Sequence, residues 1–153
     1  MAKFRFEGLL KIRETERNEK KNALLLAQSK LREAKILMES REQRVAESLE
    51  ETRRLHTVQP LNPEMLRSQE RFHKTLVEQL EESKRDVELC LAEMEEKRRE
   101  LDEAVKEVKV LKTLKEKTEE RRLEEERRRS DKELDEIATQ QKMLERQKGN
   151  QRL

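Results

Sequence analysis

The sequence has no tryptophan or tyrosine, 3 phenylalanines, 2 glycines, 2 histidines and 1 cysteine. With so few glycines, no Gly-rich loop can cradle a phosphate or a dinucleotide. His56, His73 and Cys90 do not make a zinc ligand set, so we expect no metal and no cofactor. One cysteine excludes an internal disulfide bond and favours a reducing compartment. Hydrophobic residues make up 32% of the chain, too few for a globular core, because an average domain is roughly half apolar.

Long hydrophobic runs are also missing. No stretch approaches the ~20 apolar residues of a transmembrane helix, and the apolar run in residues 1–10 is too short for a signal peptide. We therefore expect a cytoplasmic protein. Paired acids such as Glu95 and Glu96 lie at solvated helix positions, without the desolvated pocket that tunes a general acid, so we do not expect an enzyme.

Charged residues are abundant and evenly mixed. They make up 47% of the chain, with 37 Lys and Arg against 35 Asp and Glu, for a net charge of +2. A nucleic-acid-binding protein would segregate its positive charge, and none is expected here. This composition, together with regularly spaced leucines, is typical of a coiled coil or long helix.

Both prolines lie in one short stretch, Leu55–Pro63. Neither Pro60 nor Pro63 fits inside a helix. Asn62 followed by Pro63 has the pattern of an N-cap and the first residue of a helix. We predict helix 1 over about residues 4–57, a turn over 58–62 and helix 2 over about 63–147. The fold class is therefore all-α, an antiparallel two-helix coiled-coil hairpin with a longer second helix, in a single domain.

Each helix carries a stripe with alternating spacings of four and three residues, as in coiled coils. In helix 1 basic residues interrupt the stripe near the start, and Leu9, Ile12 and Ala23 offer a shifted one. The helix 1 stripe is Phe6, Leu10, Arg13, Arg17, Lys20, Leu24, Ala27, Leu31, Ala34, Met38, Arg41, Val45, Ser48, Thr52 and Leu55. The helix 2 stripe is Leu66, Gln69, His73, Leu76, Leu80, Ser83, Val87, Cys90, Met94, Lys97, Leu101, Ala104, Val108 and Leu111.

A turn near Pro60 predicts which residues face each other. In antiparallel helices of equal rise, the numbers of facing residues add up to a constant, here about 121. Phe6 then lies near Lys115, and helix 2 continues alone for roughly 30 residues, or ~45 Å. We expect that part to be highly charged and supported by ion pairs such as Glu124 with Arg128, and to end near Gly149.

Three apolar groups are candidate protein-binding surfaces. At the turn, Val45 faces Leu76 and Leu49 faces Phe72. These four residues either close the coiled coil or remain partly exposed for a helix-in-groove contact. The other two groups lie at the opposite end, where both chain termini are expected; they form either local contacts and a self-associating tail or a binding surface. They are Phe4, Phe6, Leu9 and Leu10 near the start, and Leu134, Ile137, Met143 and Leu144 near the end.

These residues resemble a known family. Phe4-Arg5-Phe6 followed by Leu9-Leu10-Lys11-Ile12-Arg13-Glu14, the start of the second helix around Phe72, and Leu134-Asp135-Glu136-Ile137-Ala138 are similar to the flagellar export protein FliJ. The resemblance covers essentially the whole chain. It implies an antiparallel coiled coil that is similar to the stalk subunit of rotary ATPases.

The resemblance also implies partners. FliJ-like proteins associate with the hexameric export ATPase FliI and its regulator FliH, engage the export gate FlhA and escort substrate chaperones. The gate-binding residues would be Phe72 and Leu76, with Val45 and Leu49 on helix 1. The ATPase ring would meet the other end, at Phe4, Phe6, Leu10, Leu134 and Ile137. Such a protein would be peripheral at the cytoplasmic face of the inner membrane.

Three other interpretations remain open from the sequence. One is the equivalent stalk of a virulence type III secretion system. Another is a structural coiled coil, as a parallel dimer or scaffold. A third is a nucleic-acid-binding helical arm, which the balanced charge disfavours. The favoured hypothesis is a non-enzymatic stalk or coupling protein of the flagellar type III export apparatus.

Overall fold

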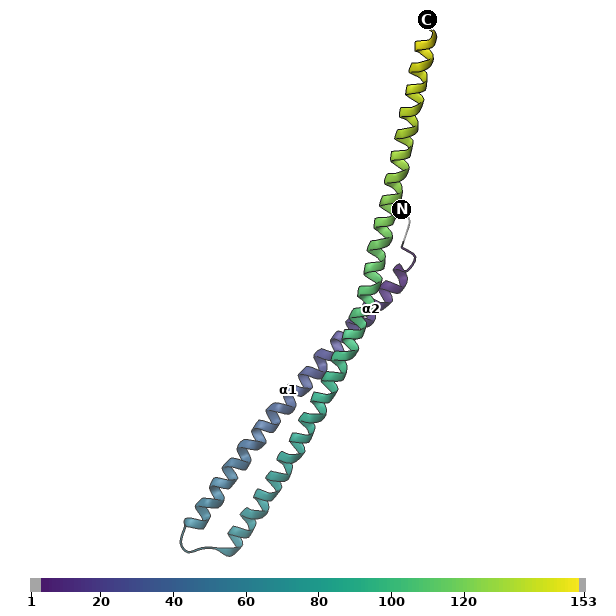
Figure 1. Ribbon diagram of the computed structural model, residues 1–153. Coiled ribbons are helices and arrows are strands. Elements are labelled where there is room, and N and C mark those ends of the chain that lie inside the picture. The colour runs from purple at the N-terminus through teal and green to yellow at the C-terminus, as the bar shows by residue number, and fades with distance from the viewer. Residues whose placement is uncertain (1–3, 152–153) are drawn as a thin grey trace. The chain divides into compact units, whose positions relative to one another are not determined.

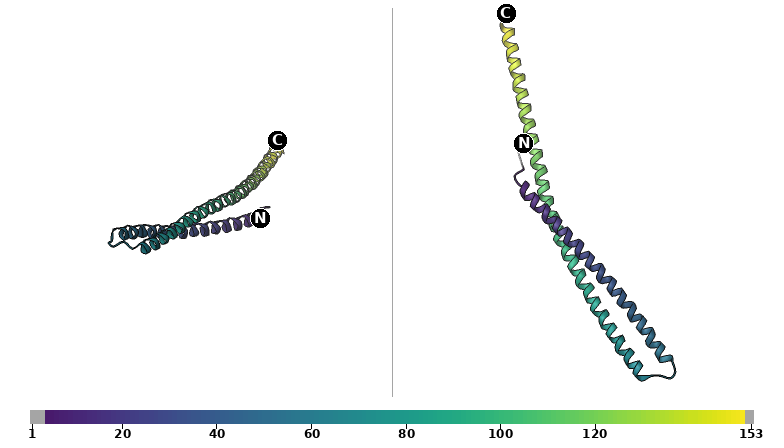
Figure 2. Two further views of the ribbon diagram at one scale, coloured as in Figure 1. Left: turned by 90° about the horizontal axis from the view of Figure 1, so that it is seen from below. Right: turned by 180° about the vertical axis from the view of Figure 1, so that it is seen from behind.

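The computed structural model describes residues 4–151, which form two helices joined by a short turn (Figure 1). Helix α1 spans Glu7–Thr57 and α2 spans Pro63–Gln151, and no strand occurs in the described residues. Within Glu14–Lys106 the two helices run in opposite directions and lie side by side (Figure 2). The predicted all-α antiparallel hairpin with a longer second helix is therefore confirmed.

The turn begins and ends where local chemistry stops each helix. The Asn62 Oδ1 atom accepts hydrogen bonds from the backbone N–H groups of Glu64 at 3.1 Å and Met65 at 3.3 Å. These are the bonds that an N-cap residue makes, and Pro63 is the first residue of α2. At the end of α1, the Thr57 hydroxyl donates to the Arg54 carbonyl at 2.8 Å. The 58–62 segment between these caps is exposed throughout.

The outer ends of the helices differ slightly from the expected ones. Helix α1 begins at Glu7 rather than near residue 4, because the chain before it makes a turn in which the Glu7 N–H group donates to the Phe4 carbonyl at 3.1 Å. Helix α2 continues through Gly149 to Gln151. Gly149 does not adopt the positive φ of a C-cap glycine, so it does not end the helix.

The chain divides into two compact units, and Glu14–Lys106 forms the larger one. Its interior is a single layer between the helices, which buries Ala27, Leu31, Leu76, Leu80 and Ala104. All residues of the two predicted stripes in this unit are buried or half-buried. The pairing also agrees with the expected register: the Lys20 Nζ atom lies 3.2 Å from the Glu100 carboxylate, and these numbers add up to about 120.

The second unit consists of the chain up to Arg13 and from Glu107 onwards. Leu10 and Val108 are buried between the helices, with exposed fractions of 4% and 2%. Ion pairs at their edges join Arg13 to Glu107 at 3.6 Å and Glu7 to Lys115 at 2.9 Å. Beyond this point α2 has no neighbouring helix among the described residues, and its side chains are almost all exposed.

The alternative stripe near the start of α1 was wrong for two of its residues. Leu9 and Ile12 are exposed, whereas Arg13 and Lys20 lie half-buried at the interface. Long basic side chains can lie along an apolar surface while their charged ends reach a partner, and here Lys20 reaches Glu100 at 3.2 Å. The first predicted stripe therefore describes the interface at Arg13 and Lys20 as well. Across the described residues, neither helix has a stretch apolar enough to cross a membrane.

Candidate functional site

Phe72 and Leu76 line one groove beside the turn. The groove has a volume of about 540 Å³, and its walls come from both helices. Phe72 is 55% exposed at its edge, whereas Leu76 is only 7% exposed and belongs to the helix interface. The residues that line the groove are Arg44, Glu47, Ser48, Glu51, Gln69, Phe72, Thr75, Leu76 and Gln79. An exposed aromatic ring next to a groove is a suitable anchor for another protein.

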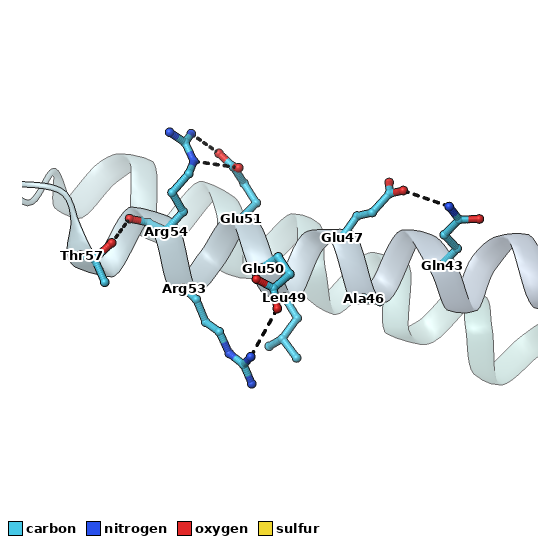
Figure 3. Close-up of a pocket in the computed structure, with 9 residues that line it drawn as sticks. All are labelled: Gln43, Ala46, Glu47, Leu49, Glu50, Glu51, Arg53, Arg54 and Thr57. Carbon is cyan, nitrogen blue, oxygen red and sulfur yellow. Dashed lines mark hydrogen bonds and ion pairs between the residues drawn. The ribbon is translucent and has the colours of Figure 1, made fainter.

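The structure does not gather all four residues predicted at the turn into one surface. Val45 is half-buried between the helices. Leu49 is exposed and lines a separate hollow made only of α1 residues (Figure 3). In that view Leu49 points to the side of α1 opposite to Glu51, and Glu51 lines the groove of Phe72. Leu49 and Phe72 therefore lie on different sides of the closed hairpin.

A set of polar contacts joins the helices under the groove. The Gln69 Nε2 atom donates to the Ser48 carbonyl and hydroxyl, both at 3.2 Å, and the His73 Nδ1 atom lies 3.1 Å from the same hydroxyl. Nearby, the Arg41 Nη1 atom donates to the Ser83 hydroxyl at 2.6 Å. Ser48 and Ser83 are buried. We call Arg41, Ser48, Gln69, His73 and Ser83 the tip latch.

The tip latch was not recognised from the sequence. Its members appeared there only as polar positions within the two stripes. The contact between Ser48 and His73 could have been predicted, because their numbers add up to 121 and the two residues therefore face each other. Polar residues at facing interface positions can hydrogen-bond to each other, and such pairs are known to specify register in coiled coils.

The outer surface of α1 near the turn carries a tight ion pair. The Arg54 guanidinium lies 2.6 Å from the Glu51 carboxylate, at a spacing of three residues along the helix. The hydrogen bond from Arg54 lowers the pKa of the Glu51 carboxyl, and the same bond raises the pKa of Arg54. Since the hollow around this pair is bounded by one helix and open to solvent, it has the form of a surface depression and not of an enclosed ligand site.

At the start of the chain, the rings of two phenylalanines contact each other. The rings of Phe4 and Phe6 meet edge to face, with centroids 5.8 Å apart and planes at 70°. The Arg5 guanidinium lies 5.7 Å from the centre of the Phe6 ring. Phe6 is exposed, Phe4 is half-buried and Leu10 is buried against α2. Of this predicted group, Phe6 and Leu9 are therefore the members exposed to a partner.

Leu134 and Ile137 lie on the part of α2 that has no neighbouring helix. Their exposed fractions are 61% and 51%. They lie roughly 30 Å further along α2 than Lys115, at a rise of about 1.5 Å per residue, and Lys115 is the residue paired with Glu7. The structure therefore does not bring them together with Phe6, and the residues predicted to meet the ATPase ring form two separate surfaces.

Between these surfaces α2 is supported by ion pairs within the helix. Arg122 contacts Glu119 at 2.6 Å and Glu126 at 2.8 Å, and Arg128 contacts Glu124 at 3.0 Å, as predicted for the latter pair. The hydrogen bond from Arg122 lowers the pKa of the Glu119 carboxyl. Such pairs stabilise an exposed helix by about 0.2–0.5 kcal/mol each.

Among residues 4–151, no group of three or more His, Cys, Asp or Glu side chains is placed to hold a metal ion. Cys90 is half-buried at the helix interface with a free thiol. The features best suited to recognition by another protein are the exposed apolar residues at the turn and on the part of α2 beyond Lys115. We call this part, which has no neighbouring helix among the described residues, the lone part of α2.

A helical hairpin that presents apolar side chains on a thin scaffold defines a coiled-coil protein whose surface is suited to contacts with other proteins. A sequence model of one family, described as Flagellar FliJ protein, matches residues 1–147. The chain therefore belongs to the FliJ family, and it is a component related to flagellar protein export. Comparison with curated proteins and with solved structures gives no significant match.

Proposed function

We propose that this protein is a non-enzymatic stalk and coupling protein of the flagellar type III export apparatus. In this function it binds the ATPase FliI and its regulator FliH at one place and the export gate FlhA at another, and it escorts substrate chaperones. It would work in the cytoplasm, at the cytoplasmic face of the inner membrane. Membership of the FliJ family over residues 1–147 is the observation that carries this proposal.

The placement of apolar side chains supports a protein with two separate binding regions. Phe72 is exposed beside the turn, in the unit formed by Glu14–Lys106. Leu134 and Ile137 are exposed in the other unit, on a helix with no neighbour among the described residues. Exposed apolar groups of this kind are typical of helix-in-groove contacts. One chain can therefore engage two partners without competition for the same residues.

The coupling that we propose is mechanical and thermodynamic. Phe6 and, on a separate surface further along α2, Leu134 and Ile137 would contact several subunits of the ATPase ring. This contact would favour assembly of the ring, because binding to the assembled form shifts the equilibrium toward it. A continuous α2 would then transmit a change at the ring to the gate through the paired helices. No step of this mechanism needs a catalytic residue in this chain.

The gate contact is tested by pull-down of FlhA with the wild-type protein and a Phe72→Ala variant. Phe72 is the cleaner choice, because Leu76 is 7% exposed and its truncation would also open a cavity in the interface. The control is Leu89→Ala, which removes an exposed apolar side chain of the same helix away from the groove. We expect Phe72→Ala to reduce binding and Leu89→Ala to leave it unchanged. Equal binding of all three proteins would contradict the gate assignment.

The ATPase contact is tested by the turnover of FliI with and without the protein. We expect the wild-type protein to bind FliI and to change its turnover, and a Leu134→Ala, Ile137→Ala double variant to do so less. A protein that neither bound the ATPase nor changed its turnover would overturn the proposal. Analytical ultracentrifugation provides an independent check, because a folded-back monomer and a parallel dimer of continuous helices differ twofold in mass.

A further inference from the structure

A second groove lies between the helices, further from the turn than the first. It has a volume of about 450 Å³, and its walls come from both helices of the Glu14–Lys106 unit. Its apolar lining consists of Ala34, Leu37, Leu89 and Cys90. Leu37 and Leu89 are 46% and 69% exposed, so a large part of each side chain is accessible to a partner. We call this depression the leucine groove.

The side of the hairpin that carries the leucine groove can be followed along both helices. In a coiled coil, residues seven apart hold the same position relative to the partner helix. Lys30 and Leu37 have this spacing on α1, and both line the groove. On α2 Asp86 also lines it. Glu93 and Glu100, at further steps of seven, therefore lie on the same side.

This side of the hairpin is rich in carboxylates. Glu33 and Leu89 also line the leucine groove, so residues at steps of seven from them belong to the same side. The acidic residues that these spacings place there are Glu19, Glu33, Glu82, Asp86, Glu93, Glu96, Glu100 and Glu103. All are exposed except Glu100, which is half-buried beside Lys20. The leucine groove is thus an apolar depression bordered by carboxylates of both helices.

The opposite side of the hairpin carries a different charge along the interface. Leu49 lies on that side of α1, and Lys35 and Lys21 precede it at multiples of seven residues. The rule of facing numbers places Lys84 and Arg98 of α2 opposite these two lysines. All four basic residues are exposed. Charges that nearly cancel over the whole chain are therefore distributed unequally between the two sides of the interface.

We infer that the leucine groove binds a basic amphipathic helix of a partner protein. The apolar face of that helix would cover Leu37 and Leu89, as in other helix-in-groove contacts. Lysine or arginine residues along the edges of that face would meet Glu33 on one wall and Asp86 on the other. The same carboxylates repel nucleic acids and anionic lipid surfaces. This site shares no residue with the groove beside the turn, and the inference does not depend on the proposed function.

A second copy of this chain is a less suitable occupant. Its basic side could approach the leucine groove, but this contact would join two different surfaces. Such a head-to-tail contact does not close in a dimer, since each added copy presents a further free groove. A helix of another protein fills the groove in one step.

The charge requirement is tested with a synthetic helix of three heptads as the probe. It carries leucine and alanine on one face, lysine on both flanks of that face, and alanine and glutamine elsewhere. A second probe has glutamate in place of each lysine. Fluorescence anisotropy of the labelled probes measures binding to the full-length protein. We expect the lysine probe to bind, less tightly as salt is added, and the glutamate probe not to bind. Binding of both probes, or of neither, would overturn the inference.

Charge reversal then locates the binding surface. We expect Asp86→Lys with Glu93→Lys to weaken binding of the lysine probe about tenfold. The matched control is Glu88→Lys with Glu95→Lys, which changes the net charge equally at exposed positions of the same helix. Consecutive residues are turned by about 100° around a helix, so Glu88 does not share the direction of Leu89. Equal weakening by both double variants would show a response to net charge alone and would contradict the inference.

The apolar requirement is tested by Leu37→Ala. We expect it to weaken binding of the lysine probe about threefold, because an exposed leucine of the groove loses its contact with the probe. Ile36→Ala is the matched control, since Ile36 is an exposed neighbour that does not line the groove. Circular dichroism should show the same thermal unfolding for both variants. Equal binding by both would mean that the probe is not seated in the leucine groove, and the inference would fail.

Sedimentation of the protein without a probe tests the second copy as an occupant. We expect no association with rising concentration that depends on the groove. Self-association that Asp86→Lys with Glu93→Lys abolishes would assign the leucine groove to a second copy and overturn the inference.

Discussion

The guanidinium of Arg41 on α1 donates a hydrogen bond from Nη1 to the hydroxyl of Ser83 on α2 at 2.6 Å, and a second one from the same atom to the carbonyl of Gln79 at 2.9 Å. A charged side chain thus occupies a position where the coiled-coil spacing calls for an apolar one. Arg41 satisfies a buried hydroxyl and a backbone carbonyl of α2 with one donor atom.

We predict that Arg41→Ala lowers the free energy of unfolding by about 1–2 kcal/mol. Hydrogen bonds to charged groups contribute about 1.5–3 kcal/mol, and the half-buried position of Arg41 reduces this value through contact with water. Urea unfolding followed by circular dichroism measures the change. Arg44→Ala, which removes an exposed arginine one turn closer to the 58–62 segment, serves as the control. Equal losses in both variants would show that the Ser83 contact contributes nothing.

The helix cap at the turn gives a second prediction. Asn62→Ala removes the acceptor of two backbone N–H groups at the start of α2, and loss of an N-cap typically costs about 1 kcal/mol. Asn62→Asp keeps the acceptor and should retain nearly full stability. The midpoint of urea unfolding separates the two variants. If alanine and aspartate behaved alike, the cap would not explain where α2 begins.

The thin apolar layer of the larger unit gives a third prediction. Leu31→Ala truncates a buried leucine, and such truncations cost about 2–5 kcal/mol, with open sites near the lower limit. Ile36→Ala on the same helix truncates an exposed side chain and should change stability by less than about 0.5 kcal/mol. Thermal unfolding of both variants provides the comparison. Similar losses would mean that the interface does not lie on the predicted face of α1.

The pH dependence of stability should depend on Glu100. The hydrogen bond from Lys20 lowers the pKa of the Glu100 carboxyl in the folded state. A lowered folded-state pKa adds stability above the unfolded-state pKa of about 4.3, and this stability is lost as the pH falls through the folded-state value. Glu100→Gln should therefore be less stable than the wild type at pH 7, and the difference should shrink as the pH falls below the unfolded-state pKa of about 4.3.

Thermal unfolding from pH 7 to pH 3 measures this difference. Glu88→Gln is the control, because it neutralises an exposed glutamate of the same helix. The pair with Lys20 is partly exposed, so salt should weaken its effect. A difference between wild type and Glu100→Gln that stayed constant with pH would contradict the assigned pKa shift.

Substitutions in the lone part of α2 should weaken binding to a partner without lowering the thermal stability of the protein. Leu134 and Ile137 contact no neighbouring helix among the described residues, so the double alanine variant should unfold at the wild-type temperature. If these residues bind the ATPase, the same variant should bind FliI more weakly. Calorimetry and a binding titration on one protein sample test both statements. A clear loss of thermal stability would show that the two side chains pack on something within the molecule or on a second copy.

Spacing along the chain was sufficient to predict the helical interface. All residues of the two stripes are buried or half-buried except Phe6, because a single turn and equal helical rise leave only one register. Residue type was a weaker guide. Leu9 and Ile12 are more apolar than Arg13 and Lys20, yet they face solvent. The energy of a long basic side chain at an interface depends on its partner, and Glu107 and Glu100 are distant in sequence.

The candidate surfaces were harder to predict than the fold. The rule that the numbers of facing residues add up to about 121 placed Leu49 opposite Phe72. This rule does not show on which side of the interface each side chain lies. The structure places the two side chains on different sides of the interface. A residue beside an interface can point to either side of it, and the numbering alone does not distinguish the two directions. The exposure of Leu134 and Ile137 was easier to anticipate, because the predicted hairpin had no residues left to cover them.

The constant register of the hairpin also restricts how this protein can change in length. A deletion in one helix shifts every pair beyond it, so that Lys20 would no longer meet Glu100, nor Arg13 meet Glu107. A deletion of seven residues from α1 alone would also uncover about 10 Å of α2. Only matched losses in both helices keep each partner opposite the other. Homologous chains of different size should therefore differ by paired heptads, placed symmetrically about Asn62 and Pro63.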